Sequence, residues 1–130
     1  MTNILEKIIQ EKKKTLEKVK KNNSLSSLED KIKTIETFLN FKDAINNNKK
    51  VSLISEIKKA SPSAGILVKD FNHLDIAKIY VDNGTTCLSV LTEEKNFLGK
   101  LDYIKDIKDN FKIPVLAKDF FIIINCIFKI

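Results

Sequence analysis

Three charged side chains stand where apolar runs of the sequence end. Glu56 and Lys58 close the run that begins at Val51, and Lys118 follows Val115–Ala117. If these runs are strands, Glu56 and Lys58 point to the same side, since residues two apart share a face. A lysine oriented by a carboxylate at a partly dry site can transfer a proton. A structural salt bridge and a solvated strand end fit the same residues, so the choice stays open.

Two further kinds of side chain near these runs could contact a ligand. Ser61 and Ser63 share a proline-containing loop and could donate hydrogen bonds to a phosphate, although this is also ordinary turn chemistry. Phe97 follows Glu93–Lys95 and could form an apolar wall or fill the core. The only histidine, His73, has no Ser or Cys partner placed for a catalytic triad. We expect it on the surface.

The elements that must position these residues alternate between strand and helix. Short apolar runs at residues 51–57, 86–91 and 114–118 predict buried parallel strands. Between them, one helix should run from its cap at Asn72 to about Asn83, and another over residues 100–110. Gly84 supplies a stop for the first of these helices. Strand–helix alternation with short connections predicts right-handed βαβ units and a parallel sheet.

Helical patterns fill the chain before the first predicted strand. Apolar residues at mostly helical spacing predict an amphipathic helix over residues 3–21. Ser26, with Glu29 three residues later, has the form of a capping box that opens a second helix. A third helical stretch spans residues 38–45. The chain therefore begins with helices and continues as an α/β fold.

The predicted sheet is a better match to a barrel than to a nucleotide-binding fold. No glycine-rich phosphate-binding turn follows the first strand, which argues against a Rossmann or P-loop domain. All three predicted strands carry polar residues at their carboxyl ends, where a (β/α)8 barrel places its active site. The 130 residues are well short of the roughly 250 of a closed barrel. We expect a segment of a barrel.

The charge of the chain narrows its possible partners. Lys and Arg total 23 against 17 Asp and Glu, a net charge of +6, and every basic residue is lysine. The planar fork of arginine that reads guanine edges is therefore absent. A lysine-rich nucleic-acid-binding module is an alternative, but glutamates interleaved in residues 1–21 argue against a basic stripe. We interpret most of the charge as solvated helix faces.

Cysteine spacing and hydropathy limit the class of protein further. Cys87 and Cys126 lack the Cys/His spacing of a zinc site. The chain shows neither the apolar core of a signal peptide nor the ~18 apolar residues that span a bilayer. We expect a cytoplasmic protein with no metal, no cofactor, no membrane and no nucleic acid among its partners.

Three segments resemble, in order and spacing, the indole-3-glycerol-phosphate synthase family. Ser55–Gly65 reads SEIKKASPSAG and is similar to the family's first-strand signature, AEIKRASPSKG. Cys87–Gly99 reads CLSVLTEEKNFLG and resembles CLSVLTDEKFFQG, and Ile113–Phe120 reads IPVLAKDF and resembles LPVLRKDF. The resemblance implies a (β/α)8 barrel after a helical extension. The domain boundaries expected from it are 1–48 for the extension, 49–120 for the first part of the barrel and 121–130 for an apolar tail.

The resemblance also implies an activity. The family closes 1-(2-carboxyphenylamino)-1-deoxyribulose 5-phosphate to indole-3-glycerol phosphate, losing carbon dioxide and water, a carboxy-lyase step of tryptophan biosynthesis. By its motif Lys118 would be the general acid that protonates the carbonyl oxygen. Lys58 would bind the substrate carboxylate and assist proton transfer, and Glu56 would position Lys58.

Three more residues would bind the substrate by the same resemblance. Ser61 would help to hold the phosphate, while Phe97 and Phe120 would line an apolar pocket for the aromatic ring. The only ligand so implied is a phosphorylated small molecule.

The resemblance ends after Phe120. The family continues there with an Asp-Pro-Tyr-Gln-Ile-like stretch, whereas residues 121–130 form an apolar tail with strand-like texture. We interpret this as a truncation or frameshift that removes strands four to eight together with the general-base glutamate. The chain alone is then expected to be inactive. The alternative is an inactive half-barrel that pairs with another chain or self-associates through an exposed sheet edge.

Overall fold

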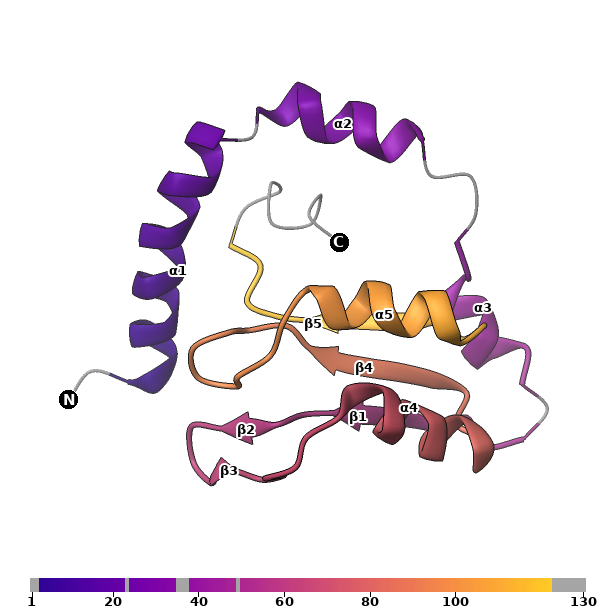
Figure 1. Ribbon diagram of the computed structural model, residues 1–130. Coiled ribbons are helices and arrows are strands. Elements are labelled where there is room, and N and C mark those ends of the chain that lie inside the picture. The colour runs from indigo at the N-terminus through magenta and orange to yellow at the C-terminus, as the bar shows by residue number, and fades with distance from the viewer. Residues whose placement is uncertain (1–2, 23, 35–37, 49, 123–130) are drawn as a thin grey trace. The chain divides into compact units, whose positions relative to one another are not determined.

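The structure is a computed structural model that describes residues 3–22, 24–34, 38–48 and 50–122. The chain divides into two compact units, Phe38–Asp119 and Met1–Thr37 with Phe120–Ile130 (Figure 1). These units reflect contacts within the chain. The boundaries expected for the helical extension, the barrel and the tail stay predictions, and most of the tail lies outside the described residues.

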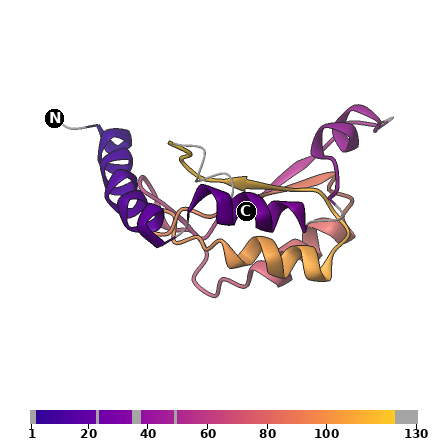
Figure 2. The same cartoon turned by 90° about the horizontal axis from the view of Figure 1, so that it is seen from above.

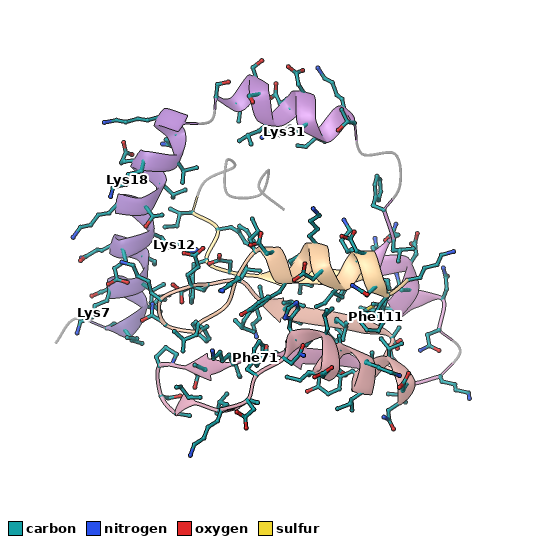
Figure 3. All side chains as sticks on the ribbon, viewed as in Figure 1. Lys7, Lys12, Lys18, Lys31, Phe71 and Phe111 are labelled. Carbon is teal, nitrogen blue, oxygen red and sulfur yellow. The ribbon has the colours of Figure 1, made fainter. Side chains whose placement is uncertain are left out.

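The described residues before residue 38 form two helices. Helix α1 spans Ile4–Asn22 and confirms the expected amphipathic helix, with Ile8 and Leu16 buried. Lys7, Lys12 and Lys18, labelled in Figure 3, are among its polar positions. Helix α2 spans Leu25–Lys33. Its N-cap is Ser24, whose side chain accepts the Ser27 N–H, so the expected capping box was placed two residues too late.

Helix α3 is shorter than its pattern predicts and spans Phe41–Asn46. The Asn40 side chain accepts the N–H of Asp43 at 3.1 Å and caps the helix there. Residues 38–40, which the sequence pattern included in the helix, are not helical. The helix contacts strand β4 of the sheet described next.

The sheet has three parallel strands in the order β1-β4-β5, which confirms the βαβ prediction (Figure 1). Strand β1 spans Ile54–Ile57, β4 spans Cys87–Leu91 and β5 spans Val115–Lys118. In their register Glu56 lies beside Ser89, and Leu91 lies beside Lys118. The first strand starts three residues later than expected. Its predicted start, Val51, is 94% exposed.

Two helices cross over from strand to strand on one face of the sheet. Helix α4 spans His73–Asp82 and packs against β1, and α5 spans Asp102–Asn110 and packs against β5. Figure 2 shows α5 and the sheet as separate layers. The predicted cap of α4 is confirmed, because the Asn72 side chain accepts the N–H groups of Leu74 and Asp75. Gly84 follows the helix at a φ of +82°, a conformation that suits glycine.

The segment after β1 is more ordered than the loop that the sequence predicts. Strands β2, Ala60–Ser61, and β3, Gly65–Ile66, form a short antiparallel hairpin. Gly65 has a φ of +66°, in the left-handed region that favours glycine. Ser61 therefore lies in a hairpin, where its backbone pairs with Gly65 of β3.

The core lies between the sheet and the helices α4 and α5. Alternate strand residues Ile57, Leu88, Val90 and Ala117 are buried with Ala77, Ile104, Ile107 and Ile113. Phe71 and Phe111, labelled in Figure 3, pack against this cluster from partly buried positions. Full burial of one such side chain contributes about 1.5–3 kcal/mol to folding. The strand positions that alternate with these, including Glu56 and Lys118, therefore point to the opposite face.

Candidate active site

Glu56 stands between two lysines at the carboxyl ends of the strands. One of its carboxylate oxygens, Oε1, lies 2.8 Å from Lys58 Nζ. The other, Oε2, accepts a hydrogen bond from Lys118 Nζ. The structure thus brings together the three charged residues that end the predicted strands. Each oxygen of the Glu56 carboxylate contacts one of the two lysines. We call Glu56, Lys58 and Lys118 the charged cluster.

The register of the sheet explains how Lys118 reaches Glu56. These residues belong to β5 and β1, which are separated by β4. Glu56 is level with Ser89 on β4, and Lys118 is level with Leu91, two residues further on. A lysine side chain is long enough to reach back across the middle strand, and all of these residues share one face. The parallel arrangement places both strand ends at one edge of the sheet.

The environment of Glu56 favours its ionised form. Burial by itself raises the pKa of the Glu56 carboxyl, but the hydrogen bonds and positive charges of Lys118 and Lys58 lower the pKa more, so it lies below its ordinary value. Two lysines with formal charges of +1 and one carboxylate of −1 leave the charged cluster with a formal charge of +1. A cluster of this kind can attract an anion and offers an N–H donor to developing negative charge.

The end of β4 also holds the backbone of Lys118. Thr92, which is buried, donates its main-chain N–H to the Lys118 carbonyl at 3.0 Å. Its hydroxyl donates to the Asp119 carboxylate at 3.3 Å. Thr92 is one of the polar residues that follow the predicted strands, but the sequence does not show its link to Lys118. The bond depends on the pairing of two strands, which no local pattern reveals.

The three residues predicted to bind the substrate lie in different segments of the chain. Ser61 Oγ accepts the Ala64 N–H at 3.2 Å and lies 3.5 Å from Ser63 Oγ, within the hairpin β2–β3. Among the described residues it makes no hydrogen bond to the charged cluster. Phe97 lies in the loop after β4 and is half-buried. Phe120 falls in the other compact unit, so its assignment rests on the sequence alone.

His73 is not the surface residue that the sequence suggests. Its Nε2 lies 2.8 Å from a carboxylate oxygen of Asp106, and its side chain is 17% exposed. Its ring also stacks on Tyr103, with 4.2 Å between ring centroids. His73 thus joins the start of α4 to α5 within the helix layer. It makes no bond to the charged cluster among the residues described.

The described residues contain neither a metal-binding cluster nor a membrane-spanning helix. No three His, Cys, Asp or Glu side chains in that part of the chain are grouped so as to hold a metal ion. None of the helices described there has the length and apolar character to cross a membrane.

Comparison with known proteins identifies the family. The family model described as indole-3-glycerol phosphate synthase matches residues 5–127. The chain is 44% identical over 117 residues to the indole-3-glycerol phosphate synthase of Desulforamulus reducens, covering 90% of this chain and 44% of the relative. The synthase of Alkaliphilus metalliredigens is 44% identical over 119 residues, covering 92% and 46%. That of Clostridium acetobutylicum is 42% identical over 120 residues, covering 92% and 45%.

The chain spans less than half the length of these curated relatives. Its helices and three-stranded parallel sheet are consistent with part of the TIM barrel of this family. Because the family model covers residues 5–127 and the relatives match most of the chain, the chain belongs to the indole-3-glycerol phosphate synthase family.

Proposed function

We propose that the protein containing this chain is a carboxy-lyase of tryptophan biosynthesis that forms indole-3-glycerol phosphate from 1-(2-carboxyphenylamino)-1-deoxyribulose 5-phosphate. The observation that carries the proposal is the charged cluster, in which one carboxylate orients two lysines at the carboxyl ends of the strands. Membership of the family supports the same reaction.

The charged cluster supplies what the reaction needs. Ring closure forms a bond between a ring carbon and the substrate carbonyl carbon, and negative charge builds on the carbonyl oxygen. Lys118 donates a proton to that oxygen, acting as general acid. Lys58 binds the substrate carboxylate and assists proton transfer. Carbon dioxide then leaves without the bonding electron pair, which returns to the ring, and water is lost. Glu56 holds both lysines in place.

The remaining parts of the substrate are assigned to flanking residues. Ser61 would donate a hydrogen bond from its hydroxyl group to the phosphate, since its oxygen already accepts the Ala64 N–H. Phe97 and Phe120 would line the pocket for the aromatic ring. A cytoplasmic location accords with the free buried thiol of Cys87. We expect a phosphorylated small molecule, and not nucleic acid or a membrane, as the partner.

A chimera tests this function directly. Residues 1–120 would be joined to the part of the Desulforamulus reducens synthase that lies beyond the match, and formation of indole-3-glycerol phosphate would be followed by fluorescence. Lys118→Ala should lower kcat by roughly 10²–10⁴ while leaving the circular dichroism spectrum unchanged, because it removes a general acid.

Lys105→Ala is the matched control, since Lys105 is an exposed lysine on α5. It should leave turnover at the level of the parent chimera. Near-parental activity of the Lys118→Ala chimera would reject the assignment of Lys118.

We also propose that the 130-residue chain by itself does not turn over substrate and self-associates. In the described part of the sheet, β1 and β5 each have a strand neighbour on one side only. Leu53, Ile54 and Leu116 on or beside these edges are about half exposed. Exposed apolar strand edges pair readily with other chains.

Light scattering together with the fluorescence assay tests this second proposal. The expected result is an associated species without activity, whose activity returns when the remaining part of the relative is supplied as a separate chain. A monodisperse monomer that turns over substrate would contradict it.

A further inference from the structure

One buried carboxylate organises the loop that follows β4. Glu93 is 3% exposed, and its Oε2 accepts the main-chain N–H groups of Asn96 at 2.7 Å and Phe97 at 3.1 Å. Its Oε1 accepts the N–H of Lys95 at 3.2 Å. Burying a carboxylate is costly unless its oxygens are hydrogen-bonded, and both oxygens of Glu93 are. The side chain therefore binds three successive main-chain N–H groups of its own loop.

The loop comprises residues 92–99, and its far end is also held by a hydrogen bond to Glu93. The Gly99 N–H donates to the Glu93 carbonyl at 2.8 Å. A Cβ at Gly99 would lie 2.2 Å from the carbonyl oxygen of Leu91, so only glycine fits against the end of β4. Leu98 adopts a φ of +52°, in the left-handed region. Main chain and side chain of Glu93 together thus hold both the middle and the end of the loop.

This loop is joined to the charged cluster at its start. Thr92, the residue before Glu93, donates its N–H to the carbonyl of Lys118. Phe97, one of the residues whose N–H Glu93 binds, is assigned above to the wall of the ring-binding pocket. Glu93 therefore stands between the end of the strand beside Lys118 and the aromatic side chain that would face the substrate.

We propose that Glu93 is a positioning residue for substrate binding, which acts by fixing the main chain of residues 95–97 and thereby the place of Phe97 against the aromatic ring. This inference rests on the function proposed above. Lys58 and Lys118 are held by Glu56, and neither is bonded to the Glu93 carboxylate. Loss of the Glu93 carboxylate should therefore weaken substrate capture more than proton transfer.

Steady-state kinetics of the chimera provide the first test. Glu93→Gln keeps the size of the side chain but turns an N–H donor toward N–H groups, and it should raise KM roughly tenfold, the scale of one lost pocket contact, with kcat within about threefold of the parent. Glu93→Asp should give an intermediate KM. A shorter carboxylate readily accepts N–H groups two and three residues on, here those of Lys95 and Asn96.

Glu94→Gln is the matched control. Glu94 is the adjacent glutamate, is exposed, and makes no hydrogen bond or ion pair with a described residue, so its KM should equal that of the parent. A purely structural role for Glu93 would lower the melting temperature and the active fraction while leaving KM unchanged. That outcome would overturn the inference.

Hydrogen exchange of the 130-residue chain gives a readout that needs no activity. The amides of Lys95, Asn96 and Phe97 should exchange faster in Glu93→Gln than in the parent chain, while the amides of α4 and α5 keep their protection. Unchanged exchange at these three amides would overturn the inference whatever the kinetics show. A parent chimera without synthase activity would instead refute the proposed function, and would remove the substrate-binding part of this inference with it.

Discussion

The two faces of the sheet β1-β4-β5 are made from alternate residues of the same strands, yet they differ in what they contribute. One face carries Ile57 and Val90 into the apolar core beneath α4 and α5. The other carries Glu56 and Lys118, whose side chains meet across β4. A period of two along each strand thus separates the residues that stabilise the fold from those that could act on a substrate. Substitutions on the two faces should therefore have separable effects on stability and on activity.

The largest effect on stability is expected within the helix-covered core. Ile107, on α5, is fully buried, so Ile107→Ala should reduce the free energy of unfolding of the 130-residue chain by about 2–5 kcal/mol. Ile79→Ala on α4 is the control, because Ile79 is 59% exposed and its loss should cost less than about 1 kcal/mol. Urea unfolding at high dilution, followed by circular dichroism, measures both. Equal losses would show that α5 does not form the cover of this face.

On the opposite face the expected loss is one of activity. Lys58→Ala in the chimera should lower kcat/KM by roughly 10²-fold, because Lys58 is assigned both substrate binding and proton transfer. Its partly exposed ion pair with Glu56 should contribute no more than about 1 kcal/mol to stability. Steady-state kinetics and urea unfolding of the same variant would compare the two effects. An unchanged kcat/KM would remove Lys58 from the site.

A smaller effect should appear as a dependence of stability on pH. The pKa of Glu56 is lowered in the folded state, so the unfolded state binds more protons as the solution is acidified. The stability from this group is present above its unfolded pKa of about 4.3 and is lost as the pH falls through the lower folded pKa.

Comparison of the parent chain with Glu56→Gln isolates this contribution. At neutral pH the variant should be less stable by roughly 1 kcal/mol, the scale of partly exposed ion pairs. The two unfolding free energies should converge as the pH is lowered toward 3 in urea titrations. A constant difference across the range would mean that Glu56 is not stabilised in its ionised form.

The smallest effect concerns a polar contact inside the helix layer. Asp106→Asn removes the charge that pairs with His73 and should cost between 0 and about 1 kcal/mol, with no change in the activity of the chimera. Asp109→Asn on the exposed side of α5 serves as control. Thermal unfolding of both variants gives the difference. A loss of activity in Asp106→Asn alone would mean that the helix layer also shapes the site.

Local patterns in the sequence predicted the helices and strands well, but they did not predict the contacts between these elements. The three apolar runs and the cap at Asn72 are features of short windows, and the structure confirms them. The choice between Ser24 and Ser26 as a cap could not be made locally, since both are good N-cap residues. The hairpin β2–β3 is only two residues long on each side, which is too short for a periodic pattern.

The candidate site shows the same limit. That Glu56 and Lys58 share a face follows from their spacing. The bond from Lys118 depends on the registers of β1 and β5 against the strand between them, β4. His73 was misjudged because its partner, Asp106, is 33 residues away. For the loop that contains Glu93 the sequence does carry a signal, because a glycine such as Gly99 can close a tight loop after a strand. A run of polar residues alone does not show which one is buried.

The bond between Lys118 and Glu56 also has a consequence for the order of folding. It joins residues 62 positions apart, and β4 must lie between their strands before the two side chains can meet. Closing a chain segment of this length carries an entropic cost that nearer contacts must offset first. We therefore expect the bond to be among the last to form. Its removal should accelerate unfolding while leaving the rate of folding nearly unchanged.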